Sequence, residues 1–258
     1  MTVRFSSGTR IALANNVAFG RLFNRGSINI YTGVQPATAD AAVTGTLLGT
    51  VTIGSGALTQ ETPATGTVTI TGGTTSVLTL TVGGFNIIPD VIGVGVPYTT
   101  TTTQMATDLA TAVNRNGIYS ATSSGAVVTL TAPPATGAAH NTYAITSTGS
   151  VTATYVAMAG GITPVNGLTF LASPTLPGVI TKTGIWSFNG VAAGTAGWFR
   201  LIGSAADGGA LQTGSPGWLP RMDGAIAVSG ADLNLSNISV AIGAPNTIDT
   251  FTFTIPSQ

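Results

Sequence analysis

Short runs of β-branched and aromatic residues, separated by glycine-rich turns, occur along most of this 258-residue chain. Leu47–Ile53 (LLGTVTI) and Thr250–Ile255 (TFTFTI) are examples. Runs of this length with Gly, Pro, Asn or Asp between them are typical of strands in antiparallel sheets. The pattern therefore predicts a mainly all-β protein whose body is a β-sandwich or jelly-roll-like domain.

The pattern of residue types changes near residue 62 and again near residue 164. Together with the N-terminal segment, this divides the chain into three parts. Residues 27–61 and 164–258 share short apolar strands, and we expect them to form one discontinuous outer β domain. Residues 62–163 lie between Gly-, Thr- and Pro-rich stretches, where insertions are tolerated. We expect them to form an inserted module, either a small β-sandwich or an α+β unit with one helix. Residues 1–26 are expected to form an N-terminal helix or arm.

Local signals define the elements of the insert. Thr67–Ile70 and Ser76–Val82 are expected to pair as strands joined by a turn at Gly72-Gly73. Thr101 and Gln104 form a capping-box pattern, and apolar residues then recur at helical spacing as far as Asn116-Gly117. This predicts one helix that begins after Thr101 and ends at that Asn-Gly pair.

The N-terminal segment is basic, because its first 30 residues contain four arginines and no acidic residue: Arg4, Arg10, Arg21 and Arg25. Ser6, Ser7 or Thr9 can cap a helix that ends at Gly26. Its expected apolar face consists of Ile11, Ala14, Val17, Ala18 and Leu22. The interpretations left open are a packed amphipathic helix, an arm whose arginines dock on an acidic neighbour, and a membrane-surface helix. No continuous apolar segment is present, so no signal peptide is expected.

Charged residues make up only 6% of the chain, against about 25% in an average soluble protein. Eight basic and eight acidic residues give no net charge, so we expect no nucleic-acid partner, which would need clustered Lys and Arg. No apolar run is long enough to span a membrane, and the absence of cysteine excludes disulfides and thiol chemistry. A surface this poor in charge favours association. We therefore expect it to be covered in an assembly, as a homo-oligomer for which a trimer is one possibility.

The sequence offers little for catalysis. The single histidine, His140, is expected to be a solvated or turn residue. Asp207, Asp223 and Asp232 lie beside glycine or other turn residues and are expected in turns, with a calcium site at Asp223 and Asp232 as an alternative. We therefore expect no enzymatic activity, no cofactor and no bound metal.

The three tryptophans have different expected roles. Trp186 and Trp198 lie inside apolar strands and are expected in the core. Trp218 lies in a Gly- and Pro-rich segment, where it is a candidate for contact with a partner.

Four strings follow one another in the outer domain: Ile30–Asp40 (IYTGVQPATAD), Gly194–Leu201 (GTAGWFRL), Met222–Leu235 (MDGAIAVSGADLNL) and Asp249–Pro256 (DTFTFTIP). In this order they resemble a family of small β-rich virion structural proteins of tailed bacteriophages. The resemblance covers roughly residues 20–60 and 164–258. Typical members lack the module at 62–163 and have a shorter loop than 203–221. The module itself resembles the Ig-like insertions of phage sheath and baseplate proteins.

This resemblance implies a non-enzymatic virion protein that is made in the host cytoplasm. We expect a decoration or cement protein on the capsid exterior, bound to the major capsid protein or to other virion proteins. The candidate contact residues are Arg4, Arg10, Arg21, Arg25 and Trp218. The alternative is a tail, baseplate or head-fibre component that contacts host-surface glycan through Trp218 and the insert. Removing residues 1–26 is expected to abolish attachment while leaving the β domain folded.

Overall fold

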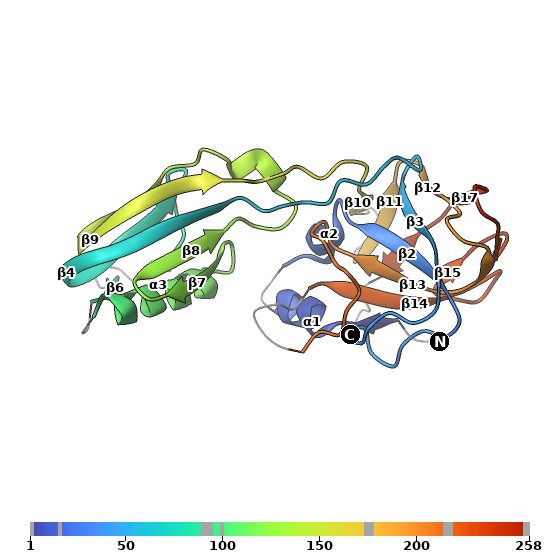
Figure 1. Cartoon of the computed structure of the whole chain (residues 1–258), viewed down its shortest axis with the longest axis horizontal. Helices are drawn as coiled ribbons and strands as arrows, with labels where there is room; N and C mark the ends of the chain where they lie inside the picture. The colour runs from blue at the N-terminus through green and yellow to red at the C-terminus, as the bar shows by residue number, and fades with distance from the viewer. Residues whose placement is uncertain are drawn as a thin grey trace. The chain divides into compact units, whose positions relative to one another are not determined.

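The computed structural model describes residues 3–14, 17–88, 95–98, 101–172, 178–213 and 219–254. Strands make up 46% of the structure and helices 14%, which confirms the expected mainly all-β fold. The chain divides into two compact units, residues 1–60 with 164–258 (unit 1) and residues 61–163 (unit 2), seen in Figure 1. Unit 2 is thus an insertion in the sequence of unit 1.

Unit 1 contains a nine-stranded sheet and a three-stranded sheet. The main path of the large sheet is β1 (Arg4–Phe5), β14 (Arg221–Ala227), β13 (Gly194–Ile202), β2 (Ser27–Thr32), β3 (Leu47–Ile53), β12 (Trp186–Asn189) and β17 (Pro245–Ile248). Two short strands, β15 (Leu233–Asn234) and β16 (Ser239–Val240), pair with β14 and β13. The small sheet consists of β10 (Thr169–Ala172), β11 (Val179–Thr183) and β18 (Thr252–Thr254).

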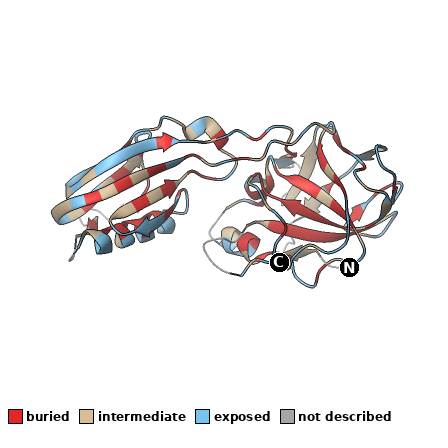
Figure 2. Ribbon diagram, in the orientation of Figure 1, coloured by how far each residue is buried: buried red, intermediate tan, exposed pale blue. Residues whose placement is uncertain are grey.

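The core of unit 1 forms because alternate residues of each strand point to the same face of the sheet. Ile28 and Ile30 of β2 share this core with Leu201 of β13, and Phe170 and Phe253 of the small sheet pack against it. Unit 1 is therefore sandwich-like. Strands β2, β13 and β14 are buried along most of their length (Figure 2), so the other face of the large sheet, called here the back face, is covered as well.

Unit 2 is one six-stranded sheet with a helix against one face (Figure 1). Its strands are β4 (Thr65–Val82), β5 (Phe85–Asn86), β6 (Val96–Pro97), β7 (Ser120–Ser124), β8 (Val127–Thr131) and β9 (Ile145–Ala159). Met105, Leu109 and Val113 of α3 (Thr102–Asn116) are fully buried in its core. The capping prediction is confirmed, because Thr101 Oγ1 accepts a hydrogen bond from the Gln104 N–H at 3.1 Å and Gly117 has a φ of 74°.

The predicted turn at Gly72-Gly73 is wrong. Strand β4 continues through both glycines and pairs along its length with β9. The register shifts on either side of the glycines, which is the local irregularity that glycine often marks inside a strand. A Cβ on Gly73 would lie 2.8 Å from the Cα of Val151, so the close approach of β9 requires glycine there.

The form of the insert is the α+β alternative. An immunoglobulin-like sandwich needs two sheets that face each other. The described residues of unit 2 form a single sheet, and α3 occupies the face that a second sheet would cover. The resemblance to Ig-like insertions is therefore not matched by the architecture of the described part.

The N-terminal segment is neither one helix nor a separate arm. It forms β1, α1 (Ser7–Ala14) and α2 (Phe19–Phe23), and the extended backbone of Ala18 (ψ 140°) prevents one helix from running through. Ser6 caps α1 by accepting a hydrogen bond from the Thr9 N–H at 3.1 Å. Phe19, Leu22 and Phe23 are buried in the core of unit 1. Removing residues 1–26 would therefore take core residues from unit 1, and the expectation that the β domain survives this deletion is corrected.

Candidate functional site

The four N-terminal arginines do not act as a group. Arg4 lies on β1, and its guanidinium donates hydrogen bonds to the backbone carbonyls of Gln35 and Pro36, so it is held within unit 1. Arg10, Arg21 and Arg25 are exposed. Arg10 donates to Ser7 Oγ at 3.1 Å, and Arg25 makes a long contact of 3.4 Å with the Pro164 carbonyl.

The three exposed arginines form no ion pair with any described residue. The salt bridges of the described residues are Arg200–Asp223 and Arg221–Asp207, and both are buried. Unit 1 also contains seven of the eight basic residues but five of the eight acidic ones. The surface near α1 and α2 therefore carries unpaired positive charge. Trp218, the fifth candidate, lies outside the described residues.

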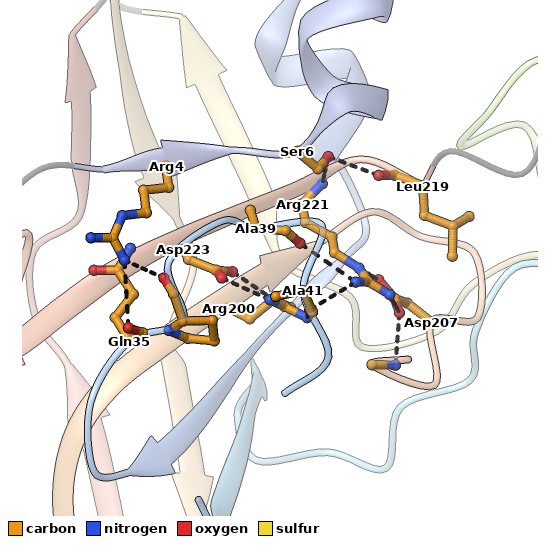
Figure 3. A network of polar contacts seen from close by, with 12 residues as sticks. Arg4, Ser6, Gln35, Ala39, Ala41, Arg200, Asp207, Leu219, Arg221 and Asp223 are labelled. Atoms are coloured by element: carbon orange, nitrogen blue, oxygen red, sulfur yellow. Dashed lines mark hydrogen bonds and ion pairs between the residues drawn. The ribbon is translucent and has the colours of Figure 1, made fainter. Parts of the chain in front are cut away.

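The strongest polar cluster of unit 1 lies on the back face of the large sheet (Figure 3). Arg200 on β13 and Asp223 on β14 are direct neighbours in register, and the guanidinium donates two hydrogen bonds of 2.7 Å to the carboxylate. Arg221, also on β14, makes two hydrogen bonds of 2.6 Å to Asp207. Such bidentate pairs are strong and fix the relative orientation of both groups.

These pairs fasten loops over the back face. Arg200 Nη1 also donates to the Ala41 carbonyl at 3.1 Å, and Arg221 reaches the Ala39 carbonyl (Figure 3). Asp40 accepts hydrogen bonds of 2.8 Å from the backbone N–H and the hydroxyl of Ser7, at the start of α1. The segment 33–46 is thus tied to the sheet and to α1, and the network is an internal scaffold of unit 1.

Burial controls the ionisation of Asp223. The carboxyl is fully buried, and this loss of solvent raises its pKa above the ordinary value, while the hydrogen bonds and charge of Arg200 oppose the rise. The buried guanidinium of Arg200 needs an anion beside it. Asp223 is therefore the counter-ion of Arg200 in the folded protein, and the pair has no free group for acid–base chemistry.

The aspartates only partly match the turn prediction. Asp207 Oδ1 accepts a hydrogen bond from the Gly209 N–H at 2.8 Å, as expected for a turn. Asp232 lies in a bend, as expected, and accepts a hydrogen bond from the Ala225 N–H at 2.9 Å. Asp223, by contrast, lies within β14. The calcium alternative needed the carboxylate of Asp223, but both of its oxygens accept hydrogen bonds from Arg200. The described residues also contain no group of three potential side-chain ligands from His, Asp or Glu.

His140 lies in a turn, which is one of the two expected placements, and it is half-buried rather than free in solvent. It ends the short 3-10 helix Gly137–His140, and its Nδ1 lies 2.8 Å from the hydroxyl of Tyr119. Its ring stacks on Tyr143 with centroids 4.9 Å apart. Glu61 binds the start of the same turn, because its carboxylate accepts hydrogen bonds of 2.7 Å from the Ala135 and Gly137 N–H groups. This cluster holds one end of unit 2 together.

Sequence reasoning missed the buried ion pairs, although a signal was present. In a chain with 6% charged residues, Arg200 stands inside the apolar run Trp198–Ile202. A charge within a buried strand requires a partner of opposite charge. Trp186 and Trp198 are fully buried, which confirms their expected place in the core.

Comparison with known proteins adds no relative, because no protein-family model and no curated protein matches the chain. The likeness to phage virion proteins stays a prediction. The structure gives its strings a physical meaning, since three of them supply the residues of the buried network: Ala39 from the first, Arg200 from the second and Asp223 from the third. No helix in the described part has the length and apolar character needed to cross a membrane.

Proposed function

We propose that the chain is a non-enzymatic structural protein of a tailed-phage virion. In this proposal it is a decoration or cement protein on the capsid exterior, which docks through unit 1 on acidic residues of the major capsid protein. The observation that carries the proposal is the set of exposed arginines Arg10, Arg21 and Arg25, which have no acidic partner among the described residues. Charge complementarity of this kind steers association and selects the partner.

The composition of the chain also favours its association with other subunits. A chain with 6% charged residues and no net charge has little electrostatic protection against association. Strand β9 adds to this, because it has fifteen residues without a charge or a proline. Among the described residues β4 is its one strand partner. Its other edge bonds to Thr142 and Tyr143 at Met158 and otherwise offers backbone groups to a neighbouring strand.

The docking role is tested on phage particles that lack this protein. The variant carries Arg10→Glu, Arg21→Glu and Arg25→Glu, and the matched control is Arg115→Glu, which reverses an exposed arginine of unit 2. Binding is measured by co-sedimentation at two salt concentrations. The proposal predicts that the triple variant binds at least about tenfold more weakly, and that salt weakens the wild type, because exposed charges are screened.

The control variant separates the two units. Arg115→Glu is expected to bind like the wild type, and so is a chain from which residues 62–163 have been removed and replaced by a short linker. Wild-type binding by the triple variant would contradict docking through this surface. Loss of binding on removal of the insert would indicate that unit 2, and not unit 1, makes the contact with the capsid.

A further inference from the structure

The loops fastened by the ion pairs do not cover the whole back face of unit 1. Over β2, β3 and β12 they leave an open hollow of about 530 Å³. Asn29, Thr50 and Thr52 line it from adjacent strands, with Asn189 and Gln60 also in its wall. A volume of this size is within the range of small-ligand sites.

The lining of the hollow is polar but nearly uncharged. Its polar groups are hydroxyls and amides, and none of the described residues that line it is Lys, Arg or His. Asp207 is the one acidic residue there, and its carboxylate already accepts hydrogen bonds from Arg221 and from the Gly209 N–H. Leu47, Leu58 and Val191 add apolar contact area. This surface suits a neutral ligand that carries both hydroxyl groups and apolar C–H groups.

Ser27 supplies an independent indication of a ligand. The residue is only 1% exposed and lines the hollow, yet its Oγ has no hydrogen-bond partner among the described residues. A buried hydroxyl without a partner costs stability. The hydroxyl is closed to solvent, so a ligand hydroxyl would provide the missing partner once the side chains that cover Ser27 move aside on binding.

We propose that this hollow binds a neutral carbohydrate. A peptide that adds to a sheet needs a free strand edge, but β2 pairs with both β13 and β3, and β3 pairs with both β2 and β12. The hollow presents side chains on a sheet face instead, as the recognition of a hydroxyl-rich ligand requires. The inference goes beyond the docking role, because none of the exposed arginines lines the hollow.

The test uses the full chain and an array of neutral and acidic oligosaccharides, followed by calorimetric titration of the best neutral one. The first variant combines Asn189→Ala with Gln60→Ala at the wall of the hollow. Its control combines Thr195→Ala with Thr250→Ala, two exposed positions of unit 1 that do not line the hollow. We expect the wall variant to bind about tenfold more weakly, as for the loss of one or two hydrogen bonds, and the control to bind normally.

Ser27→Ala separates binding from stability. If Ser27 Oγ serves the ligand, this variant binds the oligosaccharide several-fold more weakly while its urea midpoint stays the same or rises, because an unpartnered buried hydroxyl is removed. Failure of every neutral oligosaccharide to bind would overturn the inference, and so would binding that all hollow variants retain. Either result would leave attachment through the arginines untouched, since that is measured on particles.

Discussion

Replacement of Asp223 by alanine tests whether the buried ion pairs hold unit 1 together. The change removes two hydrogen bonds of 2.7 Å and leaves the guanidinium of Arg200, which is only 1% exposed, without its counter-ion. Breaking a buried pair in this way costs about 3–5 kcal/mol. For a unit of this size the melting temperature should fall by roughly 6–20 °C, since about 1 kcal/mol corresponds to about 2–4 °C.

The assay can observe unit 1 alone. All three tryptophans belong to unit 1, so urea unfolding followed by tryptophan fluorescence reports on that unit. The matched control is Asp249→Ala, at an exposed aspartate of unit 1, which should change the unfolding free energy by less than about 0.5 kcal/mol.

A double variant, Arg200→Met with Asp223→Leu, distinguishes the cost of losing the ion pair from the cost of leaving a buried charge without a partner. It should cost at least about 2 kcal/mol less than Asp223→Ala alone, because no buried charge is left unpaired. A cost below about 1 kcal/mol for Asp223→Ala, or a double variant as unstable as the single one, would refute the reasoning.

Three further predictions concern other parts of the fold. A Cβ on Gly49 would lie 2.2 Å from the ring of the buried Phe188, so Gly49→Ala should destabilise unit 1 by about 1–3 kcal/mol in the same urea assay; an unchanged midpoint would contradict this packing. Glu61→Ala removes the acceptor of the Ala135 and Gly137 N–H groups, so both amides should exchange with deuterium faster, at a cost of about 1.5–3 kcal/mol to unit 2. Equal exchange rates in the variant and the wild type would count against that role. Burial, with a smaller contribution from Tyr143, raises the pKa of Tyr119 above 10.0. The phenol of Tyr119 therefore ionises at a lower pH in the unfolded chain than in the folded one. The contribution of the neutral phenol to the stability of unit 2 is complete below about pH 10 and is lost as pH rises through the folded pKa. Far-ultraviolet circular dichroism reports the strands of both units, so the urea midpoint of unit 2 is taken from the part of this transition that the tryptophan fluorescence of unit 1 does not follow. This midpoint should fall less steeply above pH 10 in Tyr119→Phe than in the wild type, and identical slopes would disprove the assignment.

The elements that could be predicted are those whose signals are local. β3 has the bounds expected from its run of residues, and α3 follows from a capping residue, apolar spacing and a final glycine. The prediction of a turn at Gly72-Gly73 was wrong because a Gly-Gly dipeptide fits both a hairpin turn and an irregular strand. The outcome depends on β9, which is distant in the sequence.

The buried polar network could not be predicted, because its contacts join residues that are distant in the sequence. Asp223 stands before a glycine, which locally favours a turn, yet its place in β14 follows from Arg200 on the adjacent strand. Arg4 was expected to reach a partner, but carbonyls of a loop more than thirty residues away hold it. The exposure of Arg10 and Arg21 was foreseeable from their charge, whereas the division of the N-terminal segment into two helices depends on how its aromatic residues enter the core.

The most direct test of the proposed role is the number of copies of this chain in purified phage particles, measured by quantitative mass spectrometry against the major capsid protein. A decoration protein repeats with the symmetry of the shell, so the account predicts hundreds of copies per particle. Absence from the particles would contradict a virion role altogether. A count of about a dozen or fewer, as for a ring or fibre of low symmetry, would contradict the capsid role and favour the tail.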